Sequence, residues 1–159
     1  METDLTSILI GLAALATFFV PIGLHELSQK QKISKARKSL LALAEKIGIH
    51  LNEIEVLRNG TAIGIDSQNK HLLYLKKGTE IILNINKVNS CKPYKNQKNE
   101  LSEDGNSRTV QEMGIHISFL NGQSHKEEEK LIFFEGIEGN VAGDESIIIQ
   151  RWINKINKI

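Results

Sequence analysis

Apolar and polar residues follow three successive patterns along this chain. Residues 5–24 form a run of about twenty residues without a charged side chain. Residues 26–48 place apolar side chains three and four positions apart, which is the spacing of one helix face. From residue 52 onward apolar and polar residues alternate singly, as in strands with one buried face. The pattern predicts a helical N-terminal part followed by a β-rich domain over 52–159, and thus an α+β chain.

The apolar run over 5–24 has the length of a membrane span. At about 1.5 Å per residue, twenty helical residues cover about 30 Å, the thickness of a hydrocarbon core. A core helix would need a polar stripe toward water, and the run has none. The small residues at 14–16 resemble a signal-peptide cleavage site, but a signal peptide begins with basic residues and this chain begins with Glu2 and Asp4. We therefore expect a retained transmembrane helix over 5–24, preceded by a short tail of residues 1–4.

The basic residues that follow the run predict its orientation. Residues 26–50 hold six basic and two acidic residues, and basic residues stay on the cytoplasmic side of a membrane. We expect a single-pass protein of the inner (cytoplasmic) membrane, with its N-terminus outside and its domain in the cytoplasm. The single cysteine, Cys91, excludes an internal disulfide. Five basic residues are expected to make weak electrostatic contact with anionic lipid: Lys30, Lys32, Lys35, Arg37 and Lys38.

The segment 26–48 is predicted to be a basic amphipathic connector helix. Gly48 is placed to end it, because glycine readily adopts the left-handed conformation at a helix C-terminus. Two interpretations of its apolar stripe stay open. Residues 33–47 form a short parallel coiled coil that makes a homodimer, or the stripe packs on the following domain or on lipid. The stripe consists of Ile33, Ala36, Leu40, Leu43 and Ile47.

The alternating region predicts seven short strands. Asn59-Gly60 separates the first two strands and is a strong signal for a tight hairpin turn. The polar stretch 95–108 has almost no apolar residue and is expected to be a flexible loop. The run Lys126–Lys130 is interpreted as a hydrated, charged hairpin tip. The strands are expected over 52–58, 62–66, 71–77, 81–85, 88–94, 114–120 and 130–135.

The chain closes with a predicted amphipathic helix over 144–159. Asp144 is placed to cap its first turn. One face carries Ile149, Trp152, Ile153 and Ile156, which are expected to form the core side of this helix. The only tryptophan of the protein is then expected to cover the open end of a small barrel.

Seven strands followed by one tryptophan-bearing helix is the element order of pleckstrin-homology-like (PH-like) domains. The segment Ile82-Leu-Asn-Ile-Asn-Lys-Val88 is similar to a strand-turn segment of bacterial PH-like domains on short membrane proteins. The resemblance implies a transmembrane helix, a basic connector and a PH-like small β-barrel closed by a C-terminal helix. It does not extend to the basic cluster of phosphoinositide-binding PH domains, because this chain has a tight turn and only Arg58 there.

Motifs of catalysis, cofactor binding and metal binding are not found. The sequence contains no G-x-S-x-G, P-loop, H-E-x-x-H or C-x-x-C pattern, and its five histidines are scattered. The net charge is only +1, and the basic residues gather in one segment, so nucleic acid is not an expected partner. The sequence predicts no catalytic residue, no cofactor and no metal.

We therefore expect a non-enzymatic, membrane-anchored binding or scaffold module that presents a PH-like domain to a cytoplasmic protein partner. An open sheet edge, or the groove beside the last helix, is the expected contact surface. Two alternatives remain open at this stage. The chain is an accessory structural subunit of a membrane complex held through its membrane helix, or it is an enzyme whose site has no recognisable motif.

Overall fold

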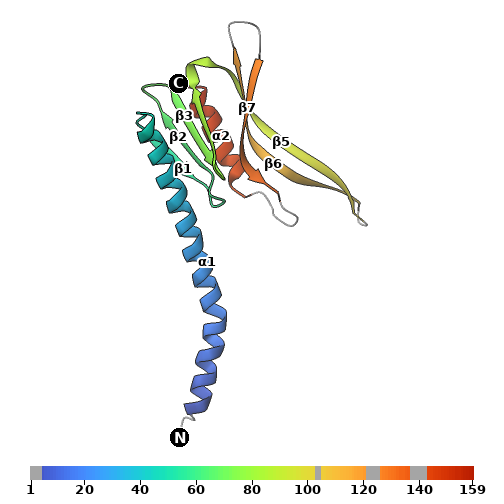
Figure 1. Ribbon diagram of the computed structural model, residues 1–159. Helices are drawn as coiled ribbons and strands as arrows, with labels where there is room; N and C mark the ends of the chain where they lie inside the picture. The colour runs from blue at the N-terminus through green and yellow to red at the C-terminus, as the bar shows by residue number, and fades with distance from the viewer. Residues whose placement is uncertain (1–4, 103–104, 121–125, 137–142) are drawn as a thin grey trace.

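The computed structural model describes residues 5–102, 105–120, 126–136 and 143–159. The expected N-terminal tail, residues 1–4, lies outside the described residues. The elements are α1 (Leu5–Lys46), β1 (Glu53–Val56), β2 (Ala62–Asp66), β3 (His71–Lys76), β4 (Thr79–Asn84), the 3-10 helix η1 (Ile85–Lys87), β5 (Val88–Ser102), β6 (Gly105–Leu120), β7 (Lys126–Glu135) and α2 (Glu145–Ile156). Strands β1-β2-β3-β4 form sheet A and strands β5-β6-β7 form sheet B, both antiparallel (Figure 1).

Helix α1 is continuous from Leu5 to Lys46 and has no break where the expected span ends. Within the part of the chain that the structure describes, no helix is sufficiently long and apolar to cross a bilayer. From residue 24 onward α1 carries six basic and two acidic side chains, whereas a span requires about twenty predominantly apolar residues. On this finding the predicted transmembrane helix over 5–24 is corrected, together with the single-pass topology and the inner-membrane localisation.

The C-terminal part of α1 packs on the outer face of sheet A. Leu40, Leu43 and Ala44 are buried against Ala62, Leu73 and Leu75 of β2 and β3. Helix α1 ends at Lys46, and Gly48, the residue predicted to stop it, follows with φ +71°, while the Ile49 amide donates to the Ala44 carbonyl at 2.9 Å. Leu40 and Leu43 of the predicted stripe are thus covered by the following domain. A homodimer through 33–47 stays a prediction. Leu40 and Leu43 are not exposed to a second copy of the chain, because they are buried against sheet A.

The turns of sheet A follow from the residues at their corners. The expected turn at Asn59-Gly60 joins β1 to β2, with Gly60 at φ +87°. Lys77 and Gly78 have φ +47° and +85° and form the two-residue loop between β3 and β4. Asp66 is buried, and its carboxylate accepts from the amides of Gln68 and Asn69 at 3.0 Å each. These hydrogen bonds to the charged form lower the pKa of Asp66 and close the turn before β3.

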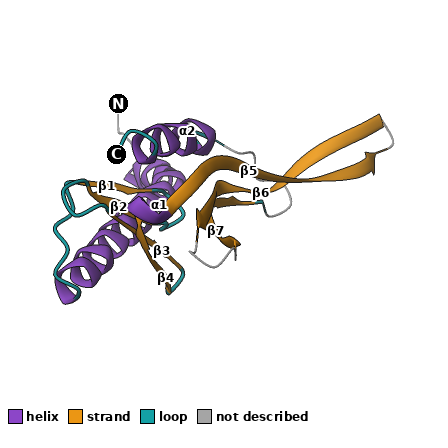
Figure 2. Cartoon of the chain, turned by 90° about the horizontal axis from the view of Figure 1, so that it is seen from above, coloured by secondary structure: helices purple, strands orange, loops and turns teal. Residues whose placement is uncertain are grey.

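Sheet B extends far beyond the core as a two-stranded arm. Strands β5 and β6 pair from Val88↔Phe119 to Ser102↔Gly105, and Figure 2 shows them projecting away from the rest of the chain. The expected flexible loop over 95–108 is therefore wrong where the structure describes it, because these residues are the paired ends of β5 and β6. Residues 103–104 lie outside the described residues. Backbone pairing between β5 and β6 holds this polar segment in strands.

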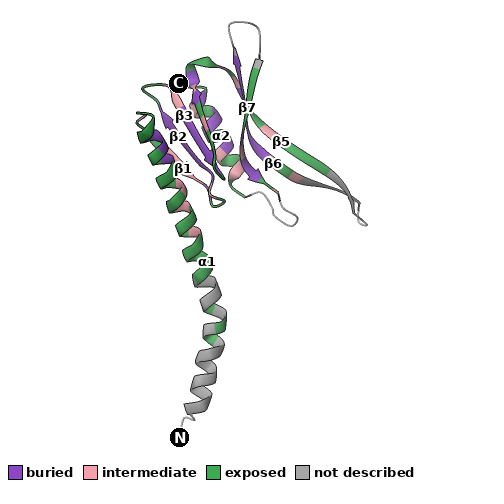
Figure 3. Cartoon of the chain, in the orientation of Figure 1, coloured by how far each residue is buried: buried purple, intermediate pink, exposed green. Residues whose placement is uncertain are grey.

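The core lies between the two sheets and is covered by α2 (Figure 3). The structure buries all four residues expected on the core side of α2, namely Ile149, Trp152, Ile153 and Ile156. Asp144 precedes α2 but makes no side-chain capping hydrogen bond, which corrects its expected role. The Glu145 carboxylate instead accepts from the Gly143 amide at 2.7 Å.

The expected closed β-barrel is wrong. Among the described residues no ladder joins sheet A to sheet B, since β4 pairs only with β3 and β7 only with β6. The chain crosses from one sheet to the other at η1, where Ile85 is buried and the Asn84 side chain accepts from the Asn86 amide. The edges of β4 and β7 are left facing one another. This opening, called the seam below, is defined by β4 and β7.

Candidate functional site

The described residues contain no group of three or more histidine, cysteine, aspartate or glutamate side chains placed to hold a metal ion. Burial raises the pKa of the Cys91 thiol to about 12, so the reactive thiolate is rare near neutral pH. His116 Nε2 lies 3.2 Å from Glu128 Oε2 on the exposed surface of sheet B. These side chains offer pairwise contacts and no convergent catalytic group.

The five basic residues predicted to touch lipid are all exposed on α1. Lys32 and Lys35 line a cavity between α1 and two turns of sheet A, whereas Lys30, Arg37 and Lys38 do not. The structure therefore divides the predicted set into two residues that face the domain and three that lie away from the cavity.

The seam runs between two antiparallel edge strands. Lys77 lies in the turn before β4, and Glu135 lies at the end of β7. Lys77 Nζ is 2.7 Å from the Glu135 carboxylate, so the two strands approach one another at this end of the seam. A cavity of about 190 Å³ is lined by Thr79 and Ile81 of β4 together with Lys130 and Ile132 of β7. A second cavity is lined by 82–84 and by 127–129. Increasing residue numbers on β4 thus face decreasing numbers on β7.

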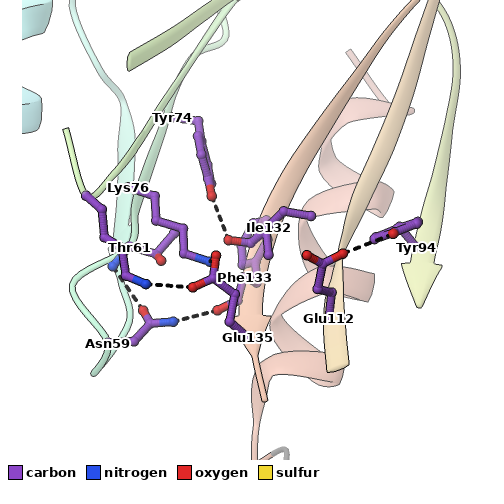
Figure 4. A network of polar contacts seen from close by, with 10 residues as sticks. Asn59, Thr61, Tyr74, Lys76, Tyr94, Glu112, Ile132, Phe133 and Glu135 are labelled. Carbon is purple, nitrogen blue, oxygen red and sulfur yellow. Dashed lines mark hydrogen bonds and ion pairs between the residues drawn. The ribbon is translucent and has the colours of Figure 1, made fainter. Parts of the chain in front are cut away.

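Side chains of sheet A close one half of the seam (Figure 4). The Tyr74 hydroxyl donates to the Ile132 carbonyl at 2.6 Å, and the Asn59 side-chain amide donates to the Phe133 carbonyl at 2.6 Å. Burial raises the pKa of Tyr74, which keeps the phenol protonated as a donor. Two backbone carbonyls of β7 are in this way bound by side chains and not by a neighbouring strand.

Glu135 forms two ion pairs across the same half of the seam. Its carboxylate lies 2.7 Å from Lys77 Nζ and 3.0 Å from Lys76 Nζ. The hydrogen bond from Lys77, followed by that from Lys76, lowers the pKa of Glu135 below its ordinary value of 4.5. The side chain of Lys76 is only 9% exposed, so Glu135 also neutralises a nearly buried ammonium group.

We predict that the Glu135 contribution to stability disappears in acid. A lowered folded-state pKa stabilises the folded chain above the unfolded-state pKa, and this stabilisation is lost as the pH falls through the folded-state pKa. Denaturant unfolding of the wild type and of Glu135→Gln should show a constant difference in unfolding free energy near neutral pH, and a shrinking difference below about pH 4.5. Glu45→Gln, on the exposed face of α1, is the control, and a pH-independent difference for Glu135→Gln would contradict the prediction.

The other half of the seam is open and acidic on one side. Its cavity has a volume of about 540 Å³. Glu127 and Glu129 pair in register with Phe119 and Ile117, both buried, so these glutamates lie on the sheet face that is turned toward the core. Both are nevertheless exposed, and they lie on β7, the edge strand of sheet B. The cavity is lined by Ile82, Leu83, Asn84, Lys87, Phe119, Glu127, Glu128 and Glu129.

Backbone groups on both strands point into the seam. The Ile85 amide donates to the Lys70 carbonyl at 2.7 Å, directly across the β3–β4 register. Hydrogen-bonded positions recur at every second residue of an antiparallel pair, so Ile82 turns its N–H and C=O toward the free edge. On β7 the same alternation, counted from Ile132, turns Lys130 and Glu128 toward the seam.

The sequence predicted an open sheet edge as one possible contact surface, but it did not identify the residues of the seam. The run Lys126–Lys130 was predicted to be a hairpin tip, and the structure places it on β7. Residues 121–125 of the predicted tip lie outside the described residues. A signal was nonetheless present. Glu127 and Glu129 share the alternation of the apolar positions 131 and 133, which continues the core-facing pattern of β7 with acids.

Comparison with protein-family models, with curated proteins and with solved structures finds no match to this chain. The similarity to PH-like domains therefore stays a prediction, and the function is inferred from the geometry of the site.

Proposed function

We propose that this chain is a protein-binding module that takes an extended segment of a partner protein into the open half of the seam. The observation that supports this most directly is the free edge of β4 beside a cavity of about 540 Å³. An unpaired strand edge is a template for another strand, and strand addition is a recurring mode of peptide recognition. The bound segment adds a strand to sheet A.

The cavity between β4 and β7 offers space beside the free edge of β4 for an added strand. A segment that pairs with β4 lies about 4.8 Å from it, on the side of this cavity. Pairing with β4 uses the outward N–H and C=O of Ile82. The closed half limits the length of the segment, because Tyr74 and Asn59 already bind the carbonyls of Ile132 and Phe133.

The lining predicts a partner segment that is both basic and apolar. Glu127 and Glu129 place two carboxylates at the cavity and favour Lys or Arg in the ligand. Leu83 and Phe119 are buried side chains that border the same cavity from the core-facing side, as the two glutamates do, so they favour an apolar residue two positions from the basic one. The polar groups of the closed half of the seam, Tyr74 and Glu135, are already engaged with Ile132 and with Lys76 and Lys77, which favours binding over catalysis.

The test is binding of a fluorescent eight-residue peptide, two repeats of Lys-Thr-Val-Thr, to the full chain, measured by anisotropy, because this repeat places lysine and valine on one face of a strand. A peptide of two Glu-Thr-Val-Thr repeats is the matched control. We expect saturable binding of the basic peptide only. Glu127→Gln combined with Glu129→Gln should weaken binding about tenfold, because two partly desolvated ion pairs are lost. Glu45→Gln, which removes a carboxylate on the exposed face of α1 outside the seam, should change affinity less than about twofold.

A second pair of variants separates strand addition from charge attraction. Ile82→Pro removes an amide on the free edge, and proline is tolerated there because that amide does not bond to β3. Ile82→Ala removes the side chain and keeps the amide. We expect the proline variant to abolish binding and the alanine variant to retain most of it, with unchanged circular dichroism in both. Equal binding by the two variants would exclude strand addition at β4.

A further inference from the structure

A second cavity, separate from the seam, lies where α1 passes two turns of sheet A. Its volume is about 460 Å³, within the range of small-molecule sites. Helix α1 forms one wall, and the β1–β2 and β3–β4 turns form the other. The lining consists of Lys32, Lys35, Ala36, Ser39, Asn59, Gly60, Leu75, Lys77, Gly78 and Glu80.

The cavity carries more positive charge than its surroundings neutralise. Within the described residues neither Lys32 nor Lys35 forms an ion pair, whereas Lys77 is paired with Glu135 at 2.7 Å. Glu80 is the one acid among the lining residues that the structure describes, and it makes no ion pair with either lysine. Two ammonium groups on successive turns of one helix face are thus available to a compact dianion.

The turns leave room for a ligand to approach the backbone. Gly60 and Gly78 lack side chains, and a Cβ atom at either position would meet no atom within 4 Å. Lys77 and Gly78 are the central residues of a two-residue hairpin loop, so their amides lie outside the ladder between β3 and β4. Backbone amides at such turns add hydrogen-bond donors to the charge of the lysines.

We propose that this cavity binds a phosphomonoester. Such a group carries about two negative charges in a compact tetrahedron, and lysine binds phosphate as a point charge. Lys32 and Lys35 pair with the phosphate oxygens, and the backbone amides of Lys77 and Gly78 donate hydrogen bonds to the remaining oxygens. The site is distinct from the seam in charge and position, so it stands or fails independently of the proposed peptide binding.

The test titrates the full chain with inorganic phosphate and then with glycerol 3-phosphate, following the backbone amide signals of Gly60 and Gly78 by NMR. The double variant Lys32→Gln/Lys35→Gln should lower affinity at least tenfold. The matched double variant Lys30→Gln/Lys38→Gln removes the same charge from the same helix outside the cavity, and it should change affinity less than about threefold. Glu80→Gln should raise affinity about threefold, because it removes the acid from the lining.

The source of the phosphate is resolved by a second arm. Phosphatidylcholine vesicles with and without phosphatidic acid present the same phosphomonoester on a lipid. Binding of glycerol 3-phosphate that depends on Lys32 and Lys35 identifies a soluble ligand, and binding only of the phosphatidic acid vesicles with the same dependence identifies a lipid. Equal losses in the two double variants, or no shift at Gly60 and Gly78 with any probe, would overturn the proposal.

Discussion

Replacing Trp152 with alanine is expected to lower the free energy of unfolding by about 3–5 kcal/mol. The indole is completely buried in the core between the two sheets. Its Nε1 atom donates to Glu55 Oε2 at 2.6 Å, and Glu55 Oε1 in turn lies 2.9 Å from Arg151 Nη1. Alanine leaves a cavity and removes the donor. A loss of this size approaches the whole stability of many domains, about 5–15 kcal/mol.

Denaturant unfolding of the full chain, followed by circular dichroism, measures the effect of Trp152→Ala. Trp152→Phe separates packing from hydrogen bonding, because it keeps an aromatic ring and loses the donor to Glu55. Ile147→Ala is the control on the same helix, at a side chain that is 62% exposed, and it should change stability by less than about 0.5 kcal/mol. An unfolding midpoint for Trp152→Ala equal to that of the wild type would show that α2 does not hold the two sheets together.

Replacing Gly114 with alanine is expected to cost about 3 kcal/mol, at the upper end of overpacking substitutions. A Cβ atom at Gly114 would lie 2.0 Å from the backbone oxygen of Leu131. The obstacle is the main chain of β7, which cannot rotate away as a side chain can. The register of β6 and β7 shifts between Met113 and Gly114, and the extra residue lets Phe133 and Phe134 both face the core.

The control for Gly114→Ala is Gly143→Ala, where the nearest atom to a new Cβ is a side-chain oxygen at 3.4 Å. This contact is ordinary, so the control should unfold within about 0.5 kcal/mol of the wild type. Amide hydrogen exchange should report faster exchange along β6 and β7 in Gly114→Ala and no change in the Gly143 variant. Wild-type stability of Gly114→Ala would mean that β7 does not approach β6 as closely as the structure places it.

The two proposed sites depend on different parts of the fold and differ in charge. The seam depends on β4 and β7 remaining unpaired, and its carboxylates favour a basic segment. The cavity beside α1 depends on the helix lying across the turns of sheet A, and its lysines favour an anion. Trp152→Ala is expected to weaken both peptide binding at the seam and phosphomonoester binding beside α1, because it destabilises the whole domain. The paired substitutions at Glu127 and Glu129, or at Lys32 and Lys35, are each expected to affect only one.

Local patterns in the sequence determined the type and order of most elements. Period-two alternation predicted β2 at its observed bounds, Ala62–Asp66, because its residues alternate between the faces of a sheet that is covered on both sides. Helical spacing predicted the four buried residues of α2, since only side chains three and four apart share a helix face. Gly48 and Asn59-Gly60 marked an end and a turn, because positive φ angles favour glycine.

Contacts between segments that are distant in the sequence determined the β5–β6 arm, the open seam between the sheets and the positions of the two cavities. The stretch 95–108 is too polar to predict strands, and pairing between β5 and β6 holds its described residues, 95–102 and 105–108, extended. Whether seven strands close into a barrel depends on the edges of β4 and β7, which no local pattern describes. The apolar run over 5–24 has the composition of a span, but its continuation into the charged part of α1 appears only in the structure. Glu127 became a candidate ligand-binding residue only when the fold placed it at a cavity. Lys32 and Lys35 were separated from the other basic residues of α1 in the same way, because the sequence does not show what a charged side chain faces.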